Sequence, residues 1–221
     1  STSKNLTGNG TVTGGAVVDT GKFDWSASDK FPSLSQAEPA YHGLKFHETF
    51  GPASYMFYNL AVGLRELGAA VAPMNAWLTI MGIETVALRM QRHSDNALAV
   101  AEWLKTRPEV AWVSYAGLSG SPYNALQKKY LPKGAGAVFT FGLKGGYDAG
   151  VKLVEGVEMF SHLANIGDTR SLIIHPASTT HRQLTAELQE SAGAGPDVVR
   201  LSVGIENVED IKADLAQALA K

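Results

Sequence analysis

Beyond Pro108 the sequence alternates short runs of β-branched and aromatic residues with longer segments of helical periodicity. This alternation constrains the fold more than any other feature, because strands and helices that follow one another in this way pack as the layers of an α/β unit. The predicted strands are Val110–Ser114, Ala137–Leu143, Ser171–His175 and Val198–Val203, and the predicted helices are Tyr123–Tyr130, Tyr147–Met159, Thr180–Glu190 and Val208–Ala220.

Two further helices are predicted before this unit, and its last helix has a clear start. A long helix covers residues 75–106, where apolar residues recur on one broad face, and it ends there because Pro108 excludes helical backbone from the residue before it. A shorter helical segment covers Met56–Ala70. The final helix is predicted to start after Asn207, whose side chain can accept a hydrogen bond from a free amide of the first turn.

The first fifty residues have a different character. Residues 1–15 are rich in glycine, serine and threonine, a composition typical of loops that come close to a ligand. The run Gly15–Asp19 (GAVVD) then predicts a short buried strand. From Lys22 to Pro52 no periodicity is sustained, so we expect an ordered excursion whose aromatic side chains need a surface to pack on.

Composition excludes several classes of protein. With 19 basic and 21 acidic residues the formal net charge is −2, which lacks the broad positive field of a nucleic-acid-binding protein. The most apolar stretch, residues 68–83, contains Pro73 and Asn75, so we expect no membrane span and a soluble protein. The absence of cysteine excludes disulfides and thiolate chemistry and fits a reducing cytoplasm. Because the chain opens at Ser1 without a targeting segment, we interpret it as a piece of a longer polypeptide.

Lys4 is the first candidate for chemistry. Taken by itself, a lysine near a terminus is a solvated surface charge. Here, however, Ser1 and Ser3 flank it and Thr7 and several glycines follow, so hydroxyl donors and turn amides gather beside one amine. Such donors suit a phosphate, although the lysine precedes the glycines and the pattern is therefore not a P-loop. A lysine beside a phosphate site suggests a covalent bond to a phosphorylated aldehyde.

Arg200 is the second candidate. The period of two in a strand places Val199 and Leu201 on one face, with Arg200 and Ser202 on the other. Two interpretations stay open at this point. Either the guanidinium is half exposed or paired with a protein carboxylate, or it binds the α-carboxylate of an amino acid through two parallel hydrogen bonds.

Other candidates have simple explanations. Ser171 opens a predicted strand, where a serine is most often a local cap or turn hydroxyl. His47 and Glu48 begin like a zinc-protease motif, but Gly51 stands where its second histidine is needed, so no metal site is predicted.

The first ten residues, STSKNLTGNG, resemble the S-x-[ST]-K attachment motif of the pyridoxal-phosphate (PLP) enzymes of Cys/Met metabolism. One departure is Asn9, where many relatives have histidine. Within this family, the segments KFDW and YHG are most similar to the O-acetylhomoserine sulfhydrylase branch. The resemblance covers essentially the whole chain, and its other matching stretches are residues 21–25, 39–44, 131–137, 160–168, 171–181 and 200–206.

The resemblance implies an α/β architecture of fold type I, similar to aspartate aminotransferase. Residues 1–73 are then the C-terminal part of the PLP-binding domain, and residues 74–221 are a long connecting helix and a smaller C-terminal α/β domain. Lys4 is implied to bond the PLP aldehyde, with Ser1 and Ser3 donating to its phosphate. The residues implied to bind the substrate are Arg200, Ser171 and Asn165.

The implied activity is γ-replacement on O-acetyl-L-homoserine, in which sulfide or a thiol displaces acetate and L-homocysteine forms for methionine biosynthesis. The family also implies a homo-oligomer, usually a tetramer, whose active site needs the N-terminal portion of the same polypeptide. Two alternatives remain: a γ- or β-lyase that admits water in place of sulfide, and a catalytically incomplete C-terminal fragment.

Overall fold

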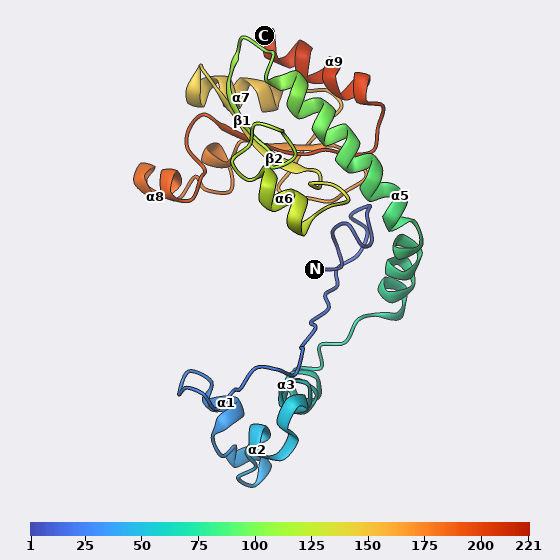
Figure 1. The fold of residues 1–221 in the computed structure, drawn as a ribbon, viewed down its shortest axis with the longest axis vertical. Helices are drawn as coiled ribbons and strands as arrows, with labels where there is room; N and C mark the ends of the chain where they lie inside the picture. The colour runs from blue at the N-terminus through green and yellow to red at the C-terminus, as the bar shows by residue number, and fades with distance from the viewer. The chain divides into compact units, whose positions relative to one another are not determined.

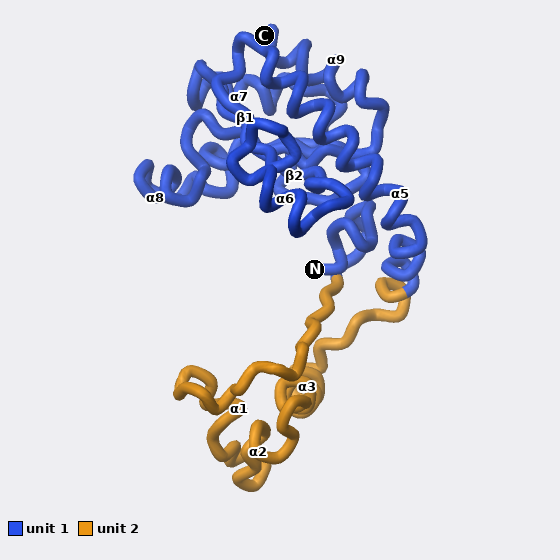
Figure 2. Tube along the Cα trace, viewed as in Figure 1, with its two compact units in different colours: residues 1–13, 77–221 blue, residues 14–76 orange.

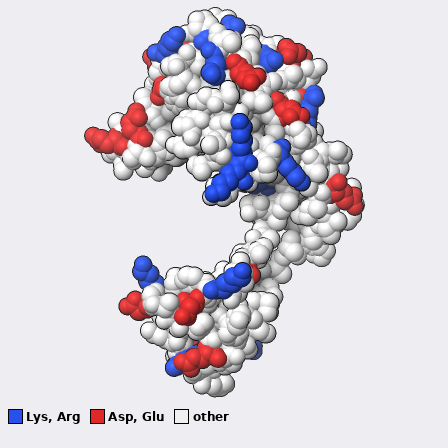
Figure 3. Space-filling view, viewed as in Figure 1, with Lys and Arg blue, Asp and Glu red and all other residues white.

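The computed structural model covers residues 1–221, which divide into two units (Figures 1 and 2). One unit consists of residues 1–13 and 77–221, and the other of residues 14–76. No helix in either unit is both long and apolar enough to cross a membrane. On the face drawn in Figure 3, acidic and basic side chains are interspersed over both units, in keeping with the nearly balanced charge.

A five-stranded sheet lies at the centre of the first unit, in the order β1-β2-β5-β4-β3. Neighbouring strands are antiparallel except β3 and β4, which are parallel. The predicted strands are confirmed with small changes at their ends, whereas β3 was not predicted. The strands are β1 Val110–Ser114, β2 Val138–Leu143, β3 Ser161–His162, β4 Leu172–Ile174 and β5 Val198–Ser202.

Helices flank the sheet, and most confirm the sequence prediction. In α9 the Asn207 side chain accepts a hydrogen bond from the Glu209 N–H at 2.9 Å, so this helix begins where the cap predicts. From residue 73 onward the helices are α5 Pro73–Leu104, α6 Asn124–Tyr130, α7 Gly146–Gly156, α8 Ala186–Ser191 and α9 Val208–Leu219, with a 3-10 turn at Pro176–Ser178.

The prediction of a helix from Thr180 is wrong in its first half. Residues 179–184 form turns, and α8 begins only after Thr185, whose hydroxyl accepts from the Leu188 N–H at 3.4 Å. Local hydroxyl contacts, such as that of Thr180 with the His181 ring at 2.9 Å, compete with helical hydrogen bonds in this stretch.

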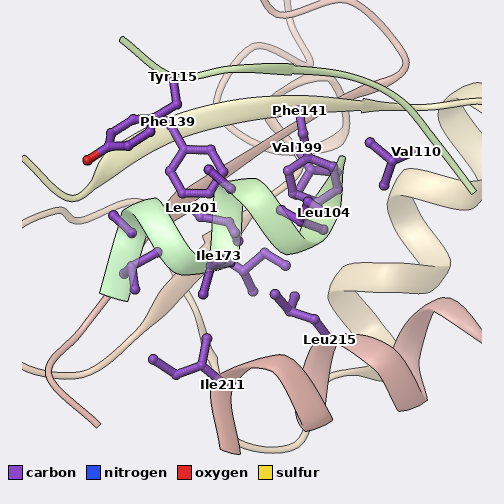
Figure 4. Packing of buried hydrophobic residues seen from close by; sticks show 14 of the residues in the cluster. Leu104, Val110, Tyr115, Phe139, Phe141, Ile173, Val199, Leu201, Ile211 and Leu215 are labelled. Atoms are coloured by element: carbon purple, nitrogen blue, oxygen red, sulfur yellow. The ribbon is translucent and has the colours of Figure 1, made fainter. Parts of the chain in front are cut away.

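The hydrophobic core lies on one face of the sheet (Figure 4). Val199 and Leu201 of β5 are fully buried there, packed with residues of α5, α7 and α9. Burying a valine or leucine side chain contributes about 1.5–3 kcal/mol, so the contacts on this face stabilise the unit strongly. The helices contribute Ala97, Val100, Ala101 and Leu104 from α5, Leu153 and Val154 from α7, and Ile211, Leu215 and Ala218 from α9.

The apolar face predicted for α5 is buried only in part. The helix joins the core from Ala97 onward, whereas on the N-terminal part of the predicted face Met81 is 48% exposed and Leu78, Val86 and Met90 are only half-buried. Periodicity therefore predicted the helix correctly, but only its C-terminal portion reaches the core.

The second unit consists of short helical segments whose aromatic side chains pack on one another. Trp25 stacks on Tyr55 with ring centroids 5.4 Å apart, and Phe46 is buried against Tyr41 and Tyr58. These contacts provide the packing surface that the aromatic residues require. The segments are α1 Pro32–Ser35, 3-10 turns at Pro39–Tyr41 and Gly51–Ala53, α2 Phe46–Phe50, α3 Ser54–Tyr58, a π-helical stretch at Asn59–Leu64 and α4 Arg65–Leu67.

The prediction of a buried strand at Gly15–Asp19 is wrong. These residues form no strand, and Val17 is 76% exposed and Val18 is 90% exposed. A strand needs a neighbouring strand for its backbone hydrogen bonds, and no strand of the sheet pairs with this segment. Apolar sequence alone therefore does not make a strand here.

Candidate functional site

Lys4 lies in a series of tight turns at the start of the chain, which we call the lysine loop (residues 1–8). The Thr7 N–H donates to the Thr2 carbonyl at 3.1 Å, and the Gly8 N–H donates to the Lys4 carbonyl at 2.8 Å. Gly8 has φ +91°, a left-handed conformation that glycine adopts at little cost. The hydroxyl residues Ser1 and Ser3 belong to the same loop, so the amine and its flanking hydroxyls share a few turns of backbone.

The lysine loop is held from two sides. From α5, the Arg89 guanidinium donates to the carbonyls of Asn5 and Leu6 at 2.8 and 3.2 Å. From a second loop, residues 164–170, the Thr169 N–H donates to the Gly8 carbonyl at 2.7 Å. The lysine loop therefore has a defined place although it contains no regular secondary structure.

Lys4, Asn165 and Arg200 are brought together. The Lys4 amine donates to the side-chain oxygen of Asn165. The Arg200 Nη2 donates to the backbone carbonyls of Ala164 and Asn165 at 3.0 and 3.4 Å. Three residues predicted separately from the sequence thus meet at the 164–170 loop. The Lys4 amine and the Arg200 guanidinium both contact Asn165 there.

Arg200 is partly buried in the middle of the sheet, opposite Thr140 of β2 and Ile174 of β4. Burial lowers the pKa of its guanidinium, which nevertheless stays charged near neutral pH. No carboxylate forms an ion pair with Arg200, so the interpretation of a pair with a protein carboxylate is not realised. Nη2 alone makes the contacts to the loop, which leaves the hydrogens of Nη1 and Nε for a ligand.

Ser171 is fully buried, and its hydroxyl has partners within the protein. The hydroxyl donates to the Glu206 carboxylate at 2.9 Å and accepts from the Gly204 N–H at 2.8 Å. Its backbone N–H donates to the same carboxylate at 2.6 Å. These contacts tie the start of β4 to the segment after β5, and binding of a substrate by Ser171 stays a prediction.

Two residues that hold the site were not selected from the sequence. The Ser202 hydroxyl accepts from the Gly167 N–H at 3.0 Å and so anchors the 164–170 loop beside Arg200. The sequence signal for Ser202 was the period of two in the strand, which places it on the same face as Arg200. For Arg89 the signal was a single charge within an apolar stretch of helix, but its partners in the lysine loop lie more than eighty residues away in the sequence.

Asp168 stabilises the 164–170 loop from within. Its carboxylate accepts from Arg170 Nε and Nη2, each at 3.1 Å, and from the Arg170 backbone N–H at 3.0 Å. Burial raises the pKa of Asp168, but the hydrogen bonds from Arg170 outweigh burial and leave this pKa below its ordinary value. The carboxylate is therefore ionised near neutral pH, and its hydrogen bonds with Arg170 stabilise the conformation of the loop.

The groups around Lys4 fit a phosphorylated aldehyde. The partner of the amine is the uncharged Asn165 side chain, and no carboxylate forms an ion pair with Lys4. The hydroxyls of Ser1 and Ser3 lie three residues and one residue before it and are suitable donors to phosphate oxygens. The loop thus offers an amine for covalent bonding and neutral donors for an anion.

Comparison with known proteins agrees with this chemistry. Residues 1–220 match the family described as Cys/Met metabolism PLP-dependent enzyme. The chain is 48% identical over 220 residues to O-acetyl-L-homoserine sulfhydrylase 1 of Thermus thermophilus, covering 100% of this chain and 52% of that protein. It is also 48% identical over 220 residues to homocysteine synthase of Schizosaccharomyces pombe, covering 99% of this chain and 51% of that protein.

A solved structure extends the similarity to the fold. A crystal structure of an O-acetylhomoserine (thiol)-lyase from Campylobacter jejuni, which carries an N'-pyridoxyl-lysine-5'-monophosphate, superposes with a TM-score of 0.88 at 38% identity. The match covers 100% of this chain and 53% of that one. The α/β fold expected from the resemblance is therefore confirmed as part of a fold type I enzyme, and the chain spans about half the length of the curated relatives it matches.

Proposed function

Because the chain belongs to the Cys/Met metabolism family of PLP-dependent enzymes, we propose that it supplies the lysine-bearing part of an enzyme that acts on O-acetyl-L-homoserine. Sulfide replaces the acetoxy group, giving L-homocysteine and acetate, and a thiol in its place gives the corresponding S-substituted homocysteine. The observation that carries the proposal is the meeting of the Lys4 amine and the Arg200 guanidinium at Asn165. An amine able to bond an aldehyde, next to a cation able to bind a carboxylate, suits an α-amino acid substrate.

Each residue has a defined part in this chemistry. PLP, when bound, supplies an electron sink for the electrons left on the substrate α-carbon as its proton leaves. Lys4 bonds the cofactor aldehyde, and Ser1 and Ser3 donate to the phosphate. Once free of that bond, Lys4 Nζ takes the α-proton as a general base. Arg200 pairs with the substrate carboxylate, and the remaining proposed substrate-binding residues are Asn165 and Ser171.

Borohydride reduction of the full-length enzyme followed by peptide mapping tests the role of Lys4. We expect a pyridoxyl group on Lys4 and none on Lys22, an exposed lysine of the second unit. The Lys4→Ala variant loses the label, and the Lys22→Ala variant keeps it. A label on another lysine in the wild-type enzyme would overturn the proposal.

A lyase of the same family is the alternative activity, because it shares the α-proton step and differs in admitting water at the later stage. Incubation of O-acetyl-L-homoserine with the enzyme and sulfide separates the two. We expect homocysteine as the main product, whereas 2-oxobutyrate in the presence of saturating sulfide supports the lyase.

We also propose that the N-terminal portion of the same polypeptide completes the active site, in a cytoplasmic homo-oligomer that is a tetramer. In that enzyme, residues 1–73 belong to the PLP-binding domain and residues 74–221 form the connecting helix and smaller domain. Intact mass and light scattering of the native enzyme test this assembly. A single 23.5 kDa species with full activity and no companion would contradict it, whereas an inactive one supports the incomplete fragment.

A further inference from the structure

Arg89 is a buried cation without an acidic partner. Its residue is 9% exposed, it lies in α5, and no carboxylate forms an ion pair with it. Taking a charged group out of water is costly unless hydrogen bonds compensate, and burial lowers the pKa of this guanidinium. The hydrogen bonds of the buried guanidinium must therefore compensate for its loss of hydration.

The guanidinium binds four oxygens, and two of them belong to the lysine loop. Nη1 donates to the Asn5 carbonyl at 2.8 Å, and Nη2 donates to the Leu6 carbonyl at 3.2 Å. The others belong to its own helix: Nη2 donates to the Gly82 carbonyl at 2.6 Å, and Nε donates to the Thr85 hydroxyl at 3.1 Å. Arg89 thus links the two residues after Lys4 to a rigid helix.

Two glycines permit this close approach. A Cβ at Gly8 would lie 2.3 Å from Arg89 Nη1, and a Cβ at Gly82 would lie 2.4 Å from the Thr7 carbonyl oxygen. A larger side chain at Gly82 would push the loop backbone, and one at Gly8 would displace the guanidinium. The loop, the guanidinium and the helix are therefore fitted to one another at main-chain distance.

We propose that Arg89 is a positioning residue for Lys4, holding the carbonyls of Asn5 and Leu6 so that the lysine amine faces Asn165 and Arg200. This inference rests on the proposed function, because it concerns the lysine that bonds the cofactor. All four oxygens that the guanidinium binds belong to the protein, and it acts through the backbone of the lysine loop.

The placement of Arg89 separates positioning from general stability. The hydrophobic core takes residues of α5 only from Ala97 onward, so Arg89 lies outside it. The lysine loop has little apolar anchoring of its own, since Leu6 is 38% exposed. Loss of the guanidinium should therefore release the loop while leaving the sheet and its helices folded.

The test compares three variants of the full-length holoenzyme with a matched control. Arg89→Met removes the donors, Arg89→Lys restores one, and Gly82→Ala keeps the guanidinium but pushes the loop from the helix. Arg92→Met is the control, because Arg92 is exposed on the same helix and makes one long contact, 3.4 Å, to the Glu206 carbonyl.

Hydrogen exchange at the Thr7 and Gly8 amides reports the loop directly, because both are hydrogen-bonded within it. In Arg89→Met and Gly82→Ala we expect these amides to exchange at least about tenfold faster, with β5 amides unchanged. We expect kcat to fall roughly 10- to 100-fold with little change in KM, since a misplaced reactive group costs turnover. Arg89→Lys should recover part of both effects.

The outcomes are separable. Wild-type loop exchange and kcat in Arg89→Met overturn the positioning role. If Arg89→Met also loses protection in β5, the decision passes to Gly82→Ala, and an unchanged loop or kcat there overturns the inference. Absence of a pyridoxyl label on Lys4 in the wild-type enzyme defeats the proposed function instead, and the loop exchange still decides what Arg89 holds.

Discussion

Along β5, Val199 and Leu201 point into the core formed with α5, α7 and α9 (Figure 4), whereas Arg200 and Ser202 lie on the opposite face beside the 164–170 loop. The first face is closed by apolar contact with three helices. The second is closed by a loop attached through polar contacts, to which Arg200 donates and from which Ser202 accepts. One strand therefore separates residues that stabilise the fold from residues that build the site.

This difference implies different consequences of substitution on the two faces. Apolar burial is non-directional and costs stability when it is lost. A polar contact on the site face fixes the place of a few atoms, so its loss should affect turnover more than folding. Substitutions one residue apart can test this division directly.

The largest effect is expected for Arg200→Met. Removal of the cation that pairs with the substrate carboxylate should lower kcat/KM roughly 10³-fold, about 4 kcal/mol, because a preorganised charged donor is lost. The urea midpoint should change little, since no protein carboxylate depends on Arg200. Steady-state kinetics and urea unfolding measure the two quantities, with exposed Arg182→Met as the control. If Arg200→Met lost as much unfolding free energy as transition-state stabilisation, the two faces of β5 would not differ in the way proposed.

The neighbouring substitution Leu201→Ala should do the reverse. Leu201 is 0% exposed in the core, and truncation of such a leucine costs about 2–5 kcal/mol of unfolding free energy. The molecules that remain folded should keep a kcat near that of the wild type. The control is Leu188→Ala, because Leu188 is 52% exposed on α8. A large fall in kcat without a fall in stability would mean that Leu201 contributes to the site rather than to the core.

The assignment of β5 side chains to two faces could be predicted from the sequence, because it depends only on neighbouring residues. A period of two assigns Val199 and Arg200 to opposite faces whatever the rest of the chain does. The two-residue β3 could not be foreseen, since it exists only through its parallel pairing with Leu172 and Ile173 of β4. The same dependence explains Gly15–Asp19, which has strand-like composition and no strand to pair with.

The sequence predicted the residues of the site one by one but not how they are arranged in space. Residue type indicated that Lys4 could bond an aldehyde and that Arg200 could bind a carboxylate, and the family resemblance implied their roles. The residue that links them spatially, Asn165, lies 161 positions from Lys4, a separation that no local pattern spans. The contacts of Arg89 and Ser202 with their loops were likewise determined by tertiary packing.

A polar group on the core side tests whether that face is purely apolar. Asp214 of α9 is 7% exposed, and its carboxylate accepts from the N–H groups of Glu158, Met159 and Phe160 at 2.8–3.1 Å. Burial raises the pKa of Asp214, but these hydrogen bonds outweigh it and leave the pKa below its ordinary value. Asp214→Asn should therefore cost roughly 2 kcal/mol of stability near pH 7, with kcat unchanged.

The pH dependence gives the sign of this effect. Because the folded-state pKa is lowered, the stabilisation by Asp214 is complete above the unfolded-state pKa near 4 and is lost as pH falls through the folded-state value. Urea unfolding at a series of pH values should show the difference between wild type and Asp214→Asn shrinking below about pH 4. Exposed Asp210→Asn on the same helix is the control. A constant difference across that range would mean that the charge of Asp214 is not what stabilises the turn.

The smallest effect, and the most specific one, is expected for Ser202→Ala. The substitution leaves the buried Gly167 N–H without its acceptor, which costs about 1 kcal/mol. Since Gly167 belongs to the loop that contacts both Lys4 and Arg200, the change should lower kcat severalfold and speed hydrogen exchange at Gly167, with no change at Leu201 in the core. Ser191→Ala, an exposed serine of α8, is the control. If exchange at Gly167 stays slow, the loop is held without Ser202, by its other contacts with Arg200 and the lysine loop.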